Sequence, residues 1–195
     1  MLESKQQLVW LDLCSGLGGA SQPALDRGWK VIRVDIDPRF KPDIVADITN
    51  LSDRRQVMDL LFQYRRIDVA WASPVCTDFT KAGLPKSWAC NRLYPSTPST
   101  TLSEACWAII NHRADWPILE NVLASRKYLS PLFGPVAAQV AGHAFWGKLP
   151  CLLPQTTGHK WRLPPSPDRA AIRAKIPYEI GEAICRAVEA RNGLA

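Results

Sequence analysis

The stretch LVWLDLCSGLGG, residues 8–19, joins a short apolar run to a glycine-rich turn. An apolar run of this length that ends in a turn is typical of a strand buried on both faces of a sheet. Ser21-Gln22-Pro23 then predicts the start of a helix with proline in its first turn, and Gly28 predicts its end. This order of strand, glycine turn and helix begins a strand–helix–strand unit.

The same alternation continues along the chain. Further strands are predicted at residues 31–34, 44–46, 67–72 and 117–119, and helices at 51–64 and 101–111. Strands alternating with helices indicate an α/β fold with a mostly parallel sheet, right-handed crossovers and helices on both faces. Ligands of such sheets bind beyond the carboxyl ends of the strands. The residues that fall at those ends are Cys14 to Gly19, Asp35, Asp47, Cys76 and Glu120.

Length and composition limit the class of protein. A chain of 195 residues predicts a single domain over residues 1–195, and its net charge of +6 is compatible with a polyanionic partner. The six cysteines form no Cys-x-x-Cys pair and no zinc spacing, so no metal is predicted. No secretion signal and no membrane span are predicted, which favours a cytoplasmic protein with reduced thiols.

Three segments of the domain have distinct compositions. Residues 77–100 are rich in proline, serine and threonine and are predicted to be a mobile catalytic loop. Residues 123–175 are predicted to be a reduced substrate-side region, and residues 149–167 within it to be irregular. Residues 176–192 carry apolar side chains on one face and predict a closing helix.

The glycine turn and the acid that follows it predict an adenosyl ligand. Asp35 ends the second predicted strand, 19 residues after Gly16, and an acid at this distance can accept hydrogen bonds from ribose hydroxyls. The alternative is a turn that serves packing alone. Because the pattern is Gly-x-Gly-Gly and not the Gly-x-Gly-x-x-Gly of pyrophosphate sites, S-adenosylmethionine is favoured.

These residues resemble motifs of the cytosine-5 DNA methyltransferases. Residues 12–21 resemble the family's first motif, residues 34–38 the second, residues 46–48 the third and residues 176–184 the tenth. The resemblance implies a Rossmann-like S-adenosylmethionine-dependent methyltransferase fold, with the tenth motif beside the first strand. It also implies a set of cofactor-binding residues: Asp12, Leu13, Cys14, Gly16, Gly18, Gly19, Asp35 on the ribose, Ile36 against adenine, Asp47 on the adenine amino group, Ile48 and Ser73.

Two further motifs carry the chemistry. Ser73-Pro74-Val75-Cys76 resembles the family's Pro-Pro-Cys nucleophile motif, with Val75 replacing the second proline, and Glu120-Asn121-Val122 matches its Glu-Asn-Val motif. Carbon 5 of cytosine is a poor nucleophile, and attack of a thiolate on carbon 6 converts the ring into an enamine that can accept a methyl group at carbon 5. A carboxyl group that stays protonated can donate to ring nitrogen 3. Cys76 and Glu120 are therefore the predicted catalytic residues.

Each of these residues also has an ordinary structural interpretation. Cys76 alone would be a small buried apolar residue, and Glu120 alone a solvated loop acid. The predicted substrate-binding residues are Pro74, Asn121, Lys81 and Arg162. Asn121 is also expected to fix the local backbone.

Two parts of the family pattern are missing from the chain. No Gln-x-Arg-x-Arg motif is present, although Arg126, Lys148, Lys160 or Arg162 could replace its arginines. There is no room for a target recognition domain, and residues 145–150 could form a reduced substrate wall. The three histidines, His112, His143 and His159, show no partner spacing, so no role is predicted for them.

The chain resembles the compact methylase-like proteins carried by bacteriophages, and three functions stay open. The first is methyl transfer to carbon 5 of cytosine in DNA or in a cytosine nucleotide, with a protein partner supplying target recognition. The second is a non-catalytic protein that binds nucleic acid or a protein, and the third is transfer of another group to a DNA base.

Overall fold

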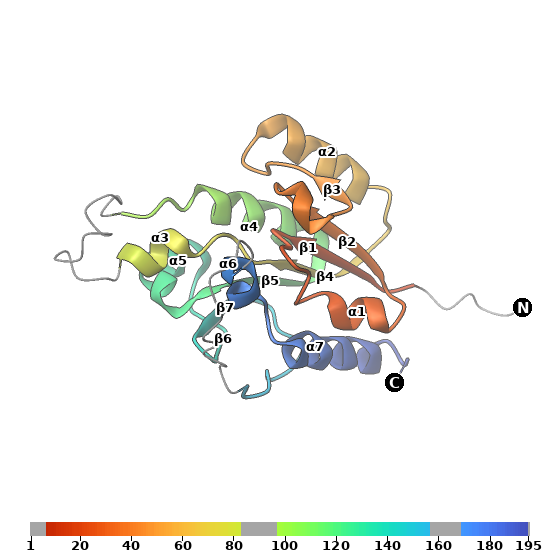
Figure 1. Ribbon diagram of the computed structural model, residues 1–195. Helices are drawn as coiled ribbons and strands as arrows, with labels where there is room; N and C mark the ends of the chain where they lie inside the picture. The colour runs from red at the N-terminus through yellow and green to blue at the C-terminus, as the bar shows by residue number, and fades with distance from the viewer. Residues whose placement is uncertain (1–6, 83–96, 157–168, 195) are drawn as a thin grey trace, which may run out of the picture.

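The computed structural model describes residues 7–82, 97–156 and 169–194, and these form a seven-stranded sheet in the order β3-β2-β1-β4-β5-β7-β6 (Figure 1). The strands are Val9–Leu13 (β1), Lys30–Asp35 (β2), Ile44–Val45 (β3), Ile67–Ala72 (β4), Ala114–Val122 (β5), Ala138–Val140 (β6) and His143–Gly147 (β7). Strands β1 to β5 are parallel, and β7 runs antiparallel to both β5 and β6.

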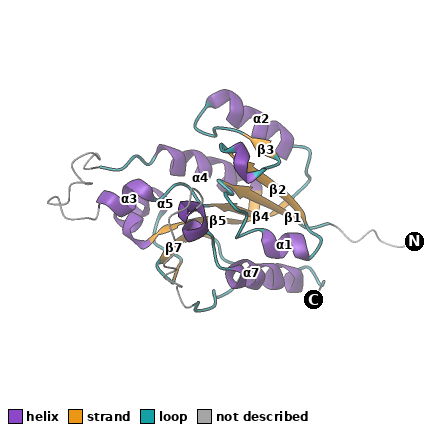
Figure 2. Ribbon diagram, in the orientation of Figure 1, coloured by secondary structure: helices purple, strands orange, loops and turns teal. Residues whose placement is uncertain are grey.

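Helices cover both faces of this sheet (Figure 2). They are Gln22–Asp26 (α1), Leu51–Leu61 (α2), Thr77–Ala82 (α3), Thr101–Arg113 (α4), Arg126–Phe133 (α5), Arg169–Ala174 (α6) and Tyr178–Arg191 (α7). Buried side chains of α2 and α4 belong to the core on one face, and those of α1 and α7 to the core on the other. Among the helices in the described part of the chain, none has the length and apolar character needed to cross a membrane.

The central strands are apolar because both of their faces are covered. All five residues of β1 and all six of β4 are buried, including the acids Asp12 and Asp68. Such continuous burial is expected of parallel strands with helices on either side. The predicted fold class, a Rossmann-like α/β fold with a mostly parallel sheet, is confirmed.

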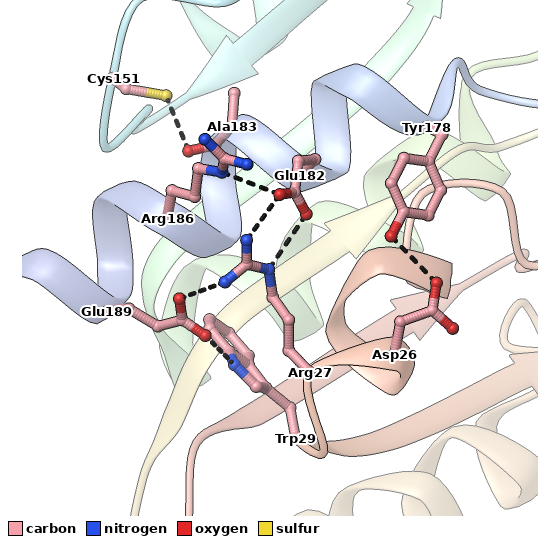
Figure 3. Close-up of polar contacts among 9 residues, drawn as sticks. All are labelled: Asp26, Arg27, Trp29, Cys151, Tyr178, Glu182, Ala183, Arg186 and Glu189. Atoms are coloured by element: carbon pink, nitrogen blue, oxygen red, sulfur yellow. Dashed lines mark hydrogen bonds and ion pairs between the residues drawn. The ribbon is translucent and has the colours of Figure 1, made fainter. Parts of the chain in front are cut away.

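The closing helix α7 lies along the first helix α1, and polar side chains fix the two together (Figure 3). The Arg27 guanidinium, just after α1, contacts Glu182 and Glu189 of α7, each at 2.5 Å. Glu189 also accepts a 3.0 Å hydrogen bond from the Trp29 indole. Residues more than 150 positions apart in the sequence are thereby joined.

The structure differs from the sequence-based expectations in two segments. The predicted loop over residues 77–100 begins with helix α3, and residues 83–96 lie outside the described part. Residues 123–175 contain α5 and the β6–β7 hairpin, which the sequence did not predict. Phe145 and Trp146 are fully buried in the core on opposite faces of β7, so the interpretation of these two side chains as a substrate wall is wrong.

Candidate active site

The parallel strands bring the predicted site residues to one edge of the sheet. Leu13, the last residue of β1, pairs with Val34 of β2 and with Ala72 of β4. Ala72 in turn pairs with Leu119 of β5. The residues that follow these positions, among them Cys14, Asp35, Ser73 and Glu120, therefore lie in a row along the carboxyl edge, as the sequence predicted.

The glycine turn after β1 is fixed to the end of β2. The Gly16 amide donates to Oδ2 of Asp35 at 2.7 Å, and the Asp37 amide donates to Oδ1 at 2.9 Å. Gly16 and Gly18 have φ angles of 47° and 70°, a region that favours glycine. The Arg33 guanidinium donates to the Gly16 carbonyl. These hydrogen bonds fix the conformation of the turn. They also fix the Asp35 carboxylate at the position where the sequence predicts contact with a ribose.

Gly19 and the closing segment are in close contact. A Cβ atom at Gly19 would lie 2.8 Å from the Ile176 carbonyl oxygen and 2.6 Å from the Lys175 side chain. Only glycine admits this approach. Residues 175–176 therefore pack against the glycine turn, next to the segment that resembles the tenth motif.

Asp12 faces the protein interior beneath the turn. It is 2% exposed, and its Oδ2 accepts a 2.5 Å hydrogen bond from the Ser21 hydroxyl. Burial raises the pKa of Asp12 to about 7, against the opposing effects of Ser21 and Arg33. Asp12 therefore connects the strand to the start of α1. The side chains of Leu13 and Ile48 are also buried, so these predicted cofactor-binding residues offer no side chain to a ligand.

The exposed groups beside the turn fit an adenosyl ligand. Ile36 is 63% exposed directly after Asp35, and Leu17 is 40% exposed within the turn, so both offer apolar surface to a ring. The buried Ser15 hydroxyl has no hydrogen-bond partner among the described residues. Asp47 accepts hydrogen bonds from the Thr49 amide and hydroxyl, and these lower the pKa of Asp47. Its carboxylate is therefore ionised and able to accept a hydrogen bond from an amino group.

Cys76 lies at the start of α3, after the loop that follows β4. Its carbonyl accepts hydrogen bonds from the Thr80 amide at 3.0 Å and the Thr80 hydroxyl at 3.1 Å. The thiol is half-buried, and burial, followed by the charge of Glu120, raises its pKa. Since the carboxylate charge of Glu120 acts on this thiol, the two predicted catalytic residues are electrostatic neighbours.

Asn121 fixes the spacing between the two catalytic candidates. Its Nδ2 donates to the Pro74 carbonyl at 2.9 Å, and its Oδ1 accepts from the Val122 amide at 2.9 Å. Asn121 is 1% exposed, so it cannot contact a substrate without rearrangement. It ties the end of β5 to the loop that carries Cys76, in agreement with its expected backbone role.

His143 is the partner of Glu120, which the sequence did not predict. Its Nδ1 lies 2.6 Å from Oε1 of Glu120, whose side chain is 8% exposed. The two residues meet because β7 pairs antiparallel with β5, with His143 opposite Val122. The sequence did contain a signal for this hairpin, the pair Ala141-Gly142. These residues form a two-residue turn with φ angles of 50° and 87°, and glycine at such a turn is typical of a hairpin.

Other predicted residues lie away from this cluster or outside the described residues. The side chain of Lys81 and the whole of Arg162 are outside them, as is Lys160. Within the described ranges, no group of three or more His, Cys, Asp or Glu side chains could hold a metal ion. A surface depression of about 790 Å³ lies along α2, lined by residues such as Leu51, Arg55 and Leu60, and contains none of the predicted site residues.

Solved structures with a related arrangement exist. The chain is similar to Entamoeba histolytica methyltransferase EhMeth, with 17% identity, a TM-score of 0.42, and coverage of 64% of this chain and 41% of that one. It is also similar to a Spodoptera frugiperda DNMT2 variant, with 18% identity, a TM-score of 0.38, and coverage of 64% and 38%. The chain thus spans about two-fifths of the length of these structures. No protein-family model and no curated protein matches it.

Proposed function

We propose that this protein transfers a methyl group from S-adenosylmethionine to carbon 5 of cytosine, in DNA or in a cytosine nucleotide, with Cys76 as the nucleophile. The observation that carries the proposal is the row of Cys76, Glu120 and the Asp35-bound glycine turn along one edge of the sheet. A thiol, a proton donor and an adenosyl site are the three groups that this reaction requires. The order of the motifs in the sequence supports the same assignment.

Cys76 begins the reaction as a thiolate. Its sulfur forms a bond to carbon 6 of the ring, and the electrons of the 5,6 double bond shift toward the ring carbonyl and nitrogen 3. Glu120, in its protonated form, donates its proton to nitrogen 3 and becomes a carboxylate. S-adenosylmethionine, when bound, supplies an electrophilic methyl group to carbon 5. Loss of the proton from carbon 5 to water, with return of the nitrogen 3 proton to the Glu120 carboxylate, then restores the 5,6 double bond as the Cys76 thiolate leaves.

The electrostatics couple the two side chains. The charge of Glu120 raises the pKa of Cys76, so an ionised Glu120 opposes thiolate formation. A Glu120 that carries the proton destined for nitrogen 3 no longer opposes it. The acid and the nucleophile therefore reach their active forms together. This coupling explains why the carboxyl group must be close to the thiol.

The adenosyl site would be built from residues near the glycine turn. Asp35 would accept hydrogen bonds from ribose hydroxyls, Ile36 would pack against adenine, and Asp47 would accept from the adenine amino group. Ser73 lies between this region and Cys76, where its hydroxyl accepts a 2.6 Å hydrogen bond from the Trp71 indole. The donor and the nucleophile would approach the pyrimidine from opposite sides.

The substrate is a nucleic acid base, and the net charge of +6 favours a polyanion. A duplex base would have to leave the helix at a cost of about a few kcal/mol, which calls for further contacts. We propose that a protein partner supplies these contacts, or that the substrate is single-stranded DNA or a free nucleotide.

Covalent trapping tests the proposal. Incubation with S-adenosylmethionine and DNA or nucleotides that contain 5-fluorocytosine should give an adduct at Cys76, because fluorine cannot leave as a proton does. Cys76→Ser should abolish the adduct and the modified base. Cys151→Ser replaces a half-buried thiol that donates a hydrogen bond to the Ala183 carbonyl. This control should leave both the adduct and the modified base unchanged.

Mass spectrometry of nucleosides from co-expressed DNA identifies the transferred group. A mass increase other than that of methyl would favour transfer of another group. Salt-sensitive DNA binding that survives Cys76→Ser, without any modified base or adduct, would favour a non-catalytic binding protein and overturn the proposal. The replacement of a proline by Val75, which is 67% exposed beside the thiol, is the observation that keeps this alternative open.

A further inference from the structure

His143 and Glu120 form a buried polar pair at the proposed active site. The distance of 2.6 Å between Nδ1 and Oε1 is that of a charge-assisted hydrogen bond, which requires a proton between the two atoms. The side chains are 20% and 8% exposed, so little solvent competes with this contact. One oxygen of the Glu120 carboxyl is therefore committed to His143, and the orientation of the other is set by it.

Resting on the function proposed above, we propose that His143 positions Glu120, the proton donor, and that its imidazolium offsets the charge of the Glu120 carboxylate beside the Cys76 thiol. His143 is a positioning residue, since it acts on the substrate only through the carboxyl group. Its ring would hold Oε1 while Oε2 faces the pyrimidine. When Glu120 gives its proton to nitrogen 3, an O–H bond breaks and an N–H bond forms. The carboxylate left behind then accepts the Nδ1–H more strongly.

The charges around the pair agree with this role. Glu120 on β5 acts on His143 of β7 through its hydrogen bond and its charge, and its charge also acts on the Cys76 thiol before α3. The hydrogen bond with Glu120 raises the pKa of His143, against the opposite effect of burial. The imidazolium is thereby favoured whenever Glu120 is ionised. A positive charge at this place offsets the carboxylate charge that opposes the Cys76 thiolate.

Alkylation of Cys76 by iodoacetamide, followed by peptide mass spectrometry across pH, tests this inference without any methyl transfer. At about pH 6.5 the wild-type thiol should react at least about threefold faster than that of His143→Gln. The two rates should converge as the pH rises and the imidazolium loses its proton. His143→Arg keeps its charge at every pH, so its thiol should stay faster throughout. His112→Gln, at an exposed histidine of α4, should match the wild type.

A double-mutant cycle with Glu120→Gln separates charge from packing. In that background, His143→Gln should slow the alkylation of Cys76 much less, because without the Glu120 hydrogen bond that raises the pKa of His143, burial favours the neutral imidazole. A slowing of equal size in both backgrounds, or one that does not change with pH, would overturn the inference. His143→Asn removes the same charge and gives the same test if the glutamine variant does not fold.

Turnover adds an independent measurement. With methyl transfer established, Glu120→Gln should reduce kcat by at least about 100-fold, the size expected of a lost proton donor. His143→Gln should reduce kcat about tenfold with a smaller effect on KM, and His143→Arg should restore part of it. If the wild-type protein neither forms a covalent adduct with any substrate nor methylates one, the proposed function is refuted. The pH dependence of Cys76 alkylation still decides the role of His143 in that case.

Discussion

Asp12→Asn should change the pH dependence of folding in a way that no exposed acid does. Burial raises the pKa of Asp12 from 3.8 to about 7. Between these two values the folded chain keeps a proton that the unfolded chain has lost, so stability falls as the pH rises through this window. One pKa unit corresponds to about 1.4 kcal/mol, which gives a loss of about 4 kcal/mol by pH 8. The asparagine variant cannot ionise at this position and should not show this loss.

The measurement is the free energy of unfolding in urea at several pH values between 4 and 8. The difference between variant and wild type should shift by about 4 kcal/mol in favour of the variant across this range. The buried amide adds a constant penalty of about 1–3 kcal/mol, which does not depend on pH. Asp59→Asn, at an exposed position of α2, is the control and should give no such shift. A difference that stays constant from pH 4 to pH 8 would refute the reasoning.

Three further substitutions test the contact between α1 and α7, the backbone strain at the end of α5, and the ion pair of Arg27. Gly181→Ala would place a Cβ atom 2.3 Å from the Ala20 carbonyl oxygen, so it should force α1 and α7 apart and cost about 1–3 kcal/mol or more in urea unfolding. Gly134→Ala, at a φ of 88° and a ψ of −169° with open space around it, should cost only the backbone strain of about 1–3 kcal/mol. Arg27→Gln should remove the contact that lowers the pKa of Glu182 to about 2, a contribution present above pH 4.5 and lost as the pH falls toward 2. Loss of this contact should lower the free energy of unfolding by about 1 kcal/mol at pH 7 and by less at pH 3. An equal decrease at both pH values would contradict a stabilising ion pair.

Most of the parallel sheet could be predicted because its strands are buried on both faces. The runs that end at Leu13 and Ala72 are apolar except for Asp12 and Asp68, which is a strong signal even in one sequence. The same argument placed Asp35 and Glu120 at one edge, since parallel strands share their carboxyl ends. The hydrogen bond from the Gly16 amide to the Asp35 carboxylate gives a physical reason for the 19-residue spacing between them.

The antiparallel part of the sheet could not be predicted in the same way. Strand β6 has three residues, too few for an alternating pattern to stand out. Helix α5 contains Pro131, a residue that sequence reasoning takes as a helix end. Without the hairpin, His143 had no visible relation to Glu120, because their contact depends on the register of β5 against β7. Long-range pairing of this kind leaves little trace in local sequence.

The contact between Gly19 and residues 175–176 also concerns the order in which the chain is made. The segment that packs against the glycine turn, and the helix that Arg27 contacts, are synthesised some 150 residues after that turn. A nascent chain that has reached only α4 therefore lacks one side of the proposed adenosyl site. Ligand capture during translation should begin only once Tyr178–Arg191 has docked, and a late, long-range closure of this kind is slow compared with local helix formation.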